Sequence, residues 1–198
     1  MSDLFIDGPS GRLEADYAAA GPVAALLCHP HPMMGGTKDD MNLASLHEGL
    51  QASGVGTLRF NFRGAGLSEG AHDEGAGEVN DVMAAAGWLR NEAGCEKLLL
   101  AGYSFGGAMA LAAQPTVSAA ALLLLAPAWP MVTFEDPDVE TLLLFGERDQ
   151  FIDVQQSRQR FSGALCDVRV LAGADHFFAA EQSTIRDAAK SFGERQVG

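Results

Sequence analysis

The chain of 198 residues carries a formal net charge of −13 at pH 7, and 47% of its residues are hydrophobic. This length and composition fit one soluble domain, residues 1–198, that buries a core without disulfides or structural metals. The excess of negative charge would repel nucleic acid over most of the surface, so we expect no nucleic-acid partner.

The N-terminal sequence, the longest apolar run and the cysteines indicate the cellular compartment of the protein. Residues 1–7 lack the basic flank and apolar stretch of a secretory signal. The longest apolar run, residues 119–126, is far shorter than the roughly 20 residues that cross a bilayer. Cys28, Cys95 and Cys166 are odd in number and lie in apolar contexts, which favours reduced buried thiols. We therefore expect a cytoplasmic protein without a membrane partner.

Short apolar runs alternate with segments of helical period, which is typical of an α/β fold with a mostly parallel twisted sheet and helices on both faces. The predicted strands are residues 23–28, 55–60, 97–101, 119–125, 141–145 and 168–171. The predicted helices are described by their apolar or bounding residues. The first carries Leu43, Leu46 and Leu50 after a cap that Thr37 forms with Asp40 three residues later. The others carry Val79, Val82, Met83, Ala86 and Leu89, then the residues from Ser104 to about Pro115, then those from about Asp153, and finally Ile185, Ala188, Ala189 and Phe192. Residues 126–140 are too short and irregular for a lid domain.

The segment Gly102-Tyr103-Ser104-Phe105-Gly106 has the pattern G-x-S-x-G. The pattern is common by chance, but here an apolar strand precedes it and a helix of small residues follows it. In that context the turn is tight, and it holds a nucleophilic serine above the end of the sheet. The alternative is a glycine-rich turn that contains an incidental serine.

A nucleophilic serine needs a base to remove its proton and an acid to orient that base. His176 follows the last predicted strand in the loop that opens the terminal helix. The alternative role for His176 is to cap this helix at the surface. The remaining histidines are His29 and His31 on an earlier loop, His47 inside a helix and His72 in a polar loop.

For the acid, Asp149 lies just beyond the predicted strand 141–145, at the sheet edge that Ser104 also faces. Asp153 is a competitor, although Gln156 three residues later suggests that it caps a helix. Asp136 and Asp138, one strand earlier, are further alternatives.

The chain order Ser104, Asp149, His176 is the order of the α/β-hydrolase triad. Together with residues 29–37, HPHPMMGGT, and residues 58–70, LRFNFRGAGLSEG, it makes nearly the whole chain resemble a compact, lid-poor bacterial branch of the α/β-hydrolase superfamily. Members of that branch are described as predicted hydrolases or esterases. The resemblance implies a serine hydrolase of the α/β-hydrolase fold with a minimal or absent cap domain.

The resemblance also implies two backbone N–H donors for the oxyanion that forms during acyl transfer. One is the N–H of Phe105, at the start of a helix whose dipole favours negative charge. The other belongs to the loop after Cys28, where Pro30 and Pro32 have no N–H to offer. The candidate is therefore His31, with Met33 second.

Three other patterns have weaker interpretations. His29-Pro30-His31, near Asp39 and Asp40, could bind a metal, but bracing of the oxyanion loop is the favoured role. Gly64-Ala65-Gly66 is rejected as a dinucleotide loop because position 69 is glutamate instead of glycine. Arg63 either bonds the backbone beside the site or is solvated.

The predicted reaction is hydrolysis of a small-molecule ester through an acyl-enzyme, without a metal or organic cofactor. Serine at position 104 disfavours the cysteine chemistry of dienelactone hydrolases and the aspartate chemistry of dehalogenases. Short or otherwise accessible acyl esters are expected, with thioesters or small amides as the alternative and a non-catalytic binding module as a different class. The apolar residues 126–132 would line the pocket, cover the core or contact another subunit, so a homo-oligomer stays open.

Overall fold

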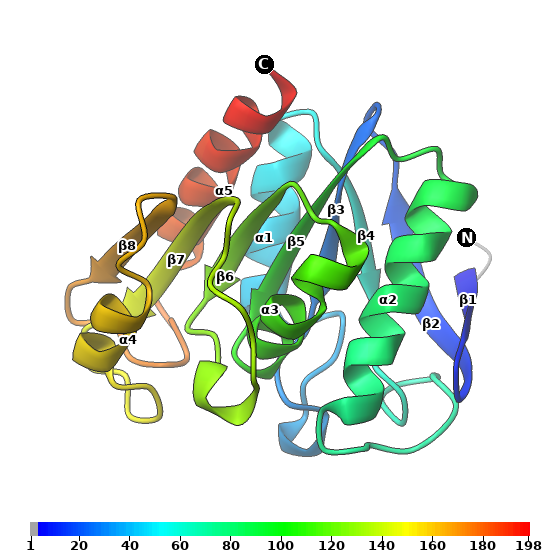
Figure 1. Cartoon of the computed structure of the whole chain (residues 1–198), viewed down its shortest axis with the longest axis horizontal. Coiled ribbons are helices and arrows are strands. Elements are labelled where there is room, and N and C mark those ends of the chain that lie inside the picture. Colours follow the sequence, from blue (N-terminus) through cyan, green and yellow to red (C-terminus); the bar gives the residue numbers. More distant parts are fainter. Residues whose placement is uncertain (1–3) are drawn as a thin grey trace.

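The computed structural model describes residues 4–198; residues 1–3, part of the stretch considered for a secretory signal, lie outside it. Eight strands form one sheet in the order β1-β2-β4-β3-β5-β6-β7-β8 (Figure 1). The strands are β1 Leu4–Gly8, β2 Gly11–Ala18, β3 Val23–Cys28, β4 Gly56–Phe60, β5 Lys97–Tyr103, β6 Ala121–Leu125, β7 Glu140–Gly146 and β8 Cys166–Leu171. The strands from β3 to β8 are parallel, whereas β1 pairs with β2 and β2 with β4 in antiparallel orientation.

Helices cover both faces of this sheet. The helices are α1 Met41–Ala52, α2 Ala76–Asn91, α3 Phe105–Val117, α4 Val154–Arg160 and α5 Gln182–Val197, and two short 3₁₀ turns are η1 Pro32–Met34 and η2 Trp129–Met131. In Figure 1, α2 and α3 lie in front of the sheet, while α1 and α5 pack against each other behind it. The chain therefore has the α/β-hydrolase fold predicted from its sequence.

The N-terminal hairpin of β1 and β2 is absent from the predicted strands. It extends the sheet beyond β4 and buries Ile6, Leu13 and Ala15. Its signal is an alternation in which Leu13 and Ala15 are separated by the charged Glu14. That pattern is typical of a strand with one buried face, not of the fully apolar strands on which the prediction relied.

Two helix details differ from the prediction. Helix α3 continues through Pro115 to Val117, and Ser118 ends it in the left-handed conformation with φ 47°. Because Pro115 lies in the last turn, its missing N–H removes only one helical bond. In α2, Met83 is exposed, since it lies one residue off the buried stripe of Val82, Ala86 and Leu89.

The thiols match the prediction in part. Cys28 and Cys95 are buried and Cys166 is half-buried, and none of the three forms a disulfide with a described residue. Burial raises the pKa of all three thiols. Within residues 4–198 no helix is long and apolar enough to cross a bilayer.

The carboxyl ends of the six parallel strands lie along one edge of the sheet (Figure 1). The loops that follow β3, β5, β6, β7 and β8 therefore meet above this edge, where ligands bind in open α/β sheets. Residues 126–139, between β6 and β7, contain only the short turn η2, so no cap domain covers the site.

Candidate active site

Ser104 lies in a sharp turn between β5 and α3. Its backbone has φ 51° and ψ −114°, a left-handed value of φ that is strained for a residue with a side chain. A Cβ atom at Gly102 would lie 2.7 Å from the backbone of Gly106, so residue 102 must be glycine. The turn is the strand-to-helix elbow that the G-x-S-x-G pattern predicts.

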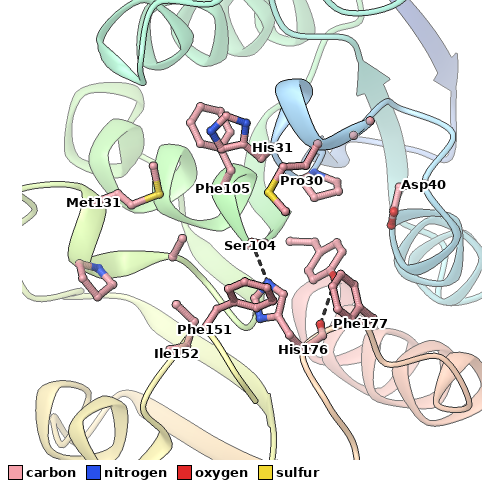
Figure 2. A pocket seen from close by; sticks show the side chains of 16 residues that line it. Pro30, His31, Asp40, Ser104, Phe105, Met131, Phe151, Ile152, His176 and Phe177 are labelled. Atoms are coloured by element: carbon pink, nitrogen blue, oxygen red, sulfur yellow. Dashed lines mark hydrogen bonds between the residues drawn. The ribbon is translucent and has the colours of Figure 1, made fainter. Parts of the chain in front are cut away.

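His176 connects Ser104 to Asp149. Its Nε2 atom is 2.9 Å from Ser104 Oγ, and its Nδ1 atom is 2.8 Å from Asp149 Oδ2 (Figure 2 shows the contact with Ser104). The side chain of His176 is 7% exposed and that of Asp149 is fully buried. The three predicted residues, from the loops after β5, β7 and β8, thus form one hydrogen-bonded chain.

Asp149 is held as an ionised acceptor. Burial by itself would raise the pKa of its carboxyl, but the hydrogen bond with His176 and two backbone N–H groups outweigh burial and hold the pKa below its usual value. The two N–H groups, from Phe151 at 2.9 Å and Ile152 at 2.8 Å, both donate to Asp149 Oδ1. Oδ2 is therefore left for His176, which fixes the orientation of the imidazole.

The competing acids have other partners. Asp153 caps α4 by accepting from the N–H groups of Gln155 and Gln156, as the sequence suggested. Asp136 forms an ion pair with Arg160, and Asp138 accepts from Gln114 Nε2 at 3.5 Å. Among the described carboxylates, Asp149 alone forms an ion pair or hydrogen bond with the His176 ring.

Tyr103 and Gln150 position the His176 loop, and the sequence reasoning missed both. The Tyr103 hydroxyl donates to the backbone oxygen of His176 at 2.9 Å, and the N–H of His176 donates to Gln150 Oε1 at 3.3 Å. Burial raises the pKa of Tyr103, which keeps its hydroxyl protonated. The signal that could have revealed the role of Tyr103 is a tyrosine at the end of an otherwise aliphatic buried strand, because a buried hydroxyl needs a hydrogen-bond partner.

The two predicted oxyanion donors border one pocket. Phe105 and His31 both line it, and neither of their N–H groups donates to another group within residues 4–198. The N–H of Met33, the second candidate, donates to His31 Nδ1 at 3.2 Å. This bond favours His31 over Met33 as the loop's free donor.

His29 braces the loop that carries His31. Its Nδ1 is 2.6 Å from the Pro30 oxygen, and its Nε2 accepts the N–H of Phe62 at 3.0 Å. Burial lowers the pKa of His29 to about 4, so the ring is neutral. Because both ring nitrogens are used, His29 has none left for a metal, and the bracing interpretation is favoured.

Arg63 fits neither of its two predicted roles. It is 6% exposed, and its guanidinium forms a bidentate ion pair with the fully buried Asp81. The backbone N–H of Arg63 also donates to Asp81 Oδ2 at 3.1 Å. The pair ties the loop after β4 to α2, and a sequence cannot reveal it because the partners come from different elements.

A pocket of about 370 Å³ lies directly above Ser104. Apolar side chains dominate its lining, and Met34, Met131, Phe151 and Phe177 are themselves exposed, so the pocket opens to solvent. The segment 126–132 has two of the roles predicted for it. Ala128, Pro130 and Met131 line the pocket, and Trp129 packs against the core. The sequence reasoning did not assign Met34, Asp40, Phe151 or Phe177 to the pocket.

A family model described as the dienelactone hydrolase family matches residues 65–196. The chain belongs to the dienelactone hydrolase family. The matched range contains Ser104, Asp149 and His176, but the loop with His31 precedes it. The sequence analysis argued against the cysteine nucleophile of dienelactone hydrolases, not against membership of the family. In this chain the residue at position 104 is serine.

Relatives and solved structures agree with this family. An uncharacterized protein of Rickettsia prowazekii is 34% identical over 90% of this chain and 82% of its own. An α/β serine hydrolase homologue of Coxiella burnetii has a TM-score of 0.89 at 29% identity and covers 96% of both chains. An α/β serine hydrolase without lid from Xanthomonas campestris has a TM-score of 0.90 at 29% identity, covering 99% of this chain and 94% of its own. The family and these neighbours support a lid-less hydrolase.

Proposed function

We propose that this chain is a serine hydrolase of carboxylic esters, with Ser104 as nucleophile, His176 as general base and Asp149 as the acid that orients it. The observation that carries the proposal is the hydrogen-bonded chain from Ser104 Oγ through both ring nitrogens of His176 to Asp149. Nucleophile, base and orienting acid in this geometry form the arrangement that activates a serine for acyl transfer.

In the first half of the reaction, Ser104 Oγ attacks the ester carbonyl while its proton moves to His176 Nε2. The carbonyl oxygen becomes an oxyanion, which the N–H groups of Phe105 and His31 stabilise. The protonated His176 then gives its proton to the leaving alcohol, and an acyl-Ser104 remains. In the second half, His176 removes a proton from water as the water oxygen attacks the acyl group, and the protonated His176 then gives that proton to Ser104 Oγ as the ester bond to Ser104 breaks and the acid leaves.

The pocket supports accessible, largely apolar ester substrates. Its lining is mostly apolar and its rim is exposed, so an acyl chain need not pass a lid to reach Ser104. The same residues would also act on a thioester or a small amide, because each forms the same tetrahedral oxyanion. These two classes are the alternative substrates.

The test is labelling by a fluorophosphonate probe, followed by a screen of p-nitrophenyl esters and thioesters of graded chain length. We expect the wild type to be labelled and to hydrolyse short esters. Ser104→Ala should lose labelling and reduce kcat by roughly 10⁴–10⁶-fold. The control is Ser162→Ala, which removes an exposed hydroxyl away from the pocket. This variant should retain both the labelling and the hydrolysis of esters.

A folded wild type that is neither labelled nor active on any ester or thioester would overturn the proposal and indicate a non-catalytic binding module. Preference for thioesters at every chain length would replace the ester assignment with a thioesterase on the same triad.

A further inference from the structure

The pocket has two chemically different sides. Figure 2 places Met131 and Ile152 on one side of Ser104. Pro130, which precedes Met131 in η2, and Ala128, which caps η2, also line the pocket, and all four side chains are apolar. On the other side Figure 2 places Asp40 and Phe177. Tyr103 also lines the pocket, and burial together with the negative charge of Asp40 raises its pKa, so these two residues lie near each other. The second side therefore combines a carboxylate with two aromatic rings.

The Asp40 carboxylate is fixed at one oxygen and available at the other. Asp40 caps α1, and its Oδ1 accepts from the N–H groups of Asn42 at 2.9 Å and Leu43 at 3.1 Å. Its Oδ2 has no hydrogen-bond partner among the described residues. The cap holds the side chain in one orientation, so Asp40 offers a preorganised acceptor in the lining of the pocket that contains Ser104.

No cation among the described lining residues neutralises Asp40. The other ionisable residues of the lining are His31, Tyr103 and His176. Lys38, two residues before Asp40, forms ion pairs with other carboxylates: its Nζ lies 2.8 Å from Asp16 Oδ2 and 3.6 Å from Glu14 Oε1. The negative charge of Asp40 therefore acts on whatever occupies this side of the pocket.

We propose that the side of the pocket formed by Asp40, Tyr103 and Phe177 is a subsite for a positively charged group of the ester substrate. This inference rests on the proposed esterase function and names the class of ester. The carboxylate attracts a cation, and the exposed ring of Phe177 adds attraction through its quadrupole. The formal charge of −13 increases the local concentration of cationic substrates and reduces that of anionic ones.

The test compares three butyrate esters of matched shape. They are choline butyrate, its uncharged isostere with tert-butyl in place of trimethylammonium, and the corresponding ester of a carboxylate-bearing alcohol. A second series carries the same three groups on the acyl chain of an ethyl ester. Release of acid is followed by titration at constant pH.

In at least one series, the wild type should have a kcat/KM about tenfold higher for the cationic than for the neutral ester, and lowest for the anionic ester. Asp40→Asn should reduce the cationic-to-neutral ratio to about one. The substitution suits this purpose because asparagine caps a helix as well as aspartate does. The series that responds identifies which half of the ester occupies the subsite.

The matched control is Asp39→Asn, which removes the same charge from the neighbouring, exposed residue outside the pocket. It should leave the ratio of cationic to neutral ester at the wild-type value. A ratio near one in the wild type for both series, or an equal fall in both variants, would overturn the subsite while the esterase stands. Absence of hydrolysis of all six esters together with absence of fluorophosphonate labelling would overturn the proposed function itself.

Discussion

Gly106 packs directly against the backbone of Cys28: a Cβ atom at position 106 would lie 2.2 Å from the Cys28 oxygen and 2.5 Å from the His29 oxygen. Cys28 ends β3 and opens the loop that carries His31, whereas Gly106 follows Phe105 in the elbow. This close approach therefore sets the distance between the two N–H groups that we assign to the oxyanion. The second glycine of the G-x-S-x-G pattern thus packs the Ser104 turn against the loop that carries His31.

Gly106→Ala should destabilise the protein by about 3 kcal/mol, because two backbone segments must separate to admit the methyl group. It should also reduce esterase activity in the fraction that folds. Urea unfolding measures the first effect and ester hydrolysis the second. The control is Gly87→Ala in α2, where the new Cβ meets nothing within 4 Å. That substitution should stabilise the protein by about 0.5–1 kcal/mol, and equal losses in both variants would contradict the packing argument.

Asp149→Asn should reduce kcat by roughly 10³–10⁴-fold with little change in KM, because an amide no longer stabilises the imidazolium or fixes the productive tautomer of His176. Steady-state ester hydrolysis measures both constants. Asp136→Asn, at an exposed carboxylate paired with Arg160, should keep wild-type activity. Full activity of Asp149→Asn together with loss in Asp136→Asn would identify Asp136 as the acid.

His31→Pro and His31→Ala separate the backbone N–H of residue 31 from its side chain. The φ of −55° at His31 suits proline, so His31→Pro removes the N–H without forcing a new φ. We expect kcat to fall by about 10²-fold in the proline variant, the effect of losing one oxyanion donor. His31→Ala keeps the N–H, so its kcat should fall much less. Comparable kcat values for the two variants would refute the donor role.

His29 should make the protein less stable in acid. Burial lowers the pKa of His29 from 6.5 to about 4, so below about pH 6.5 the unfolded chain takes up a proton that the folded chain excludes. This contribution to the free energy of unfolding is fully present at neutral pH. It should decrease by about 2 kcal/mol between about pH 7 and pH 5.

His29→Gln keeps an acceptor for the N–H of Phe62 but does not titrate. The difference in unfolding free energy between the wild type and this variant should therefore shrink as the pH falls, measured by urea unfolding at both pH values. A difference that is independent of pH would show that His29 has an ordinary pKa.

The sequence by itself determined the parts of this protein that depend on local sterics and hydrophobic pattern. The apolar runs predicted the parallel strands from 23–28 onward, because strands buried on both faces are continuously apolar. The turn at Ser104 followed from a strand, two glycines and a helix of small residues, since few backbones satisfy that combination. The charged alternation of β2 concealed the N-terminal hairpin, because its polar residues face solvent.

Only the tertiary structure decided which side chains meet. Asp149 reaches His176, and Asp136 and Asp153 do not, because the paths of two separate loops fix those distances. The sequence ranked His31 before Met33, and the structure supplied the reason to keep that order, because the N–H of Met33 donates to the His31 ring. The sequence suggested Thr37 as the cap of the first helix with Asp40 as its partner, whereas in the fold Asp40 itself caps α1 and also lines the pocket. Local pattern specifies conformation, whereas contacts between loops of different strands depend on the whole sheet that positions them.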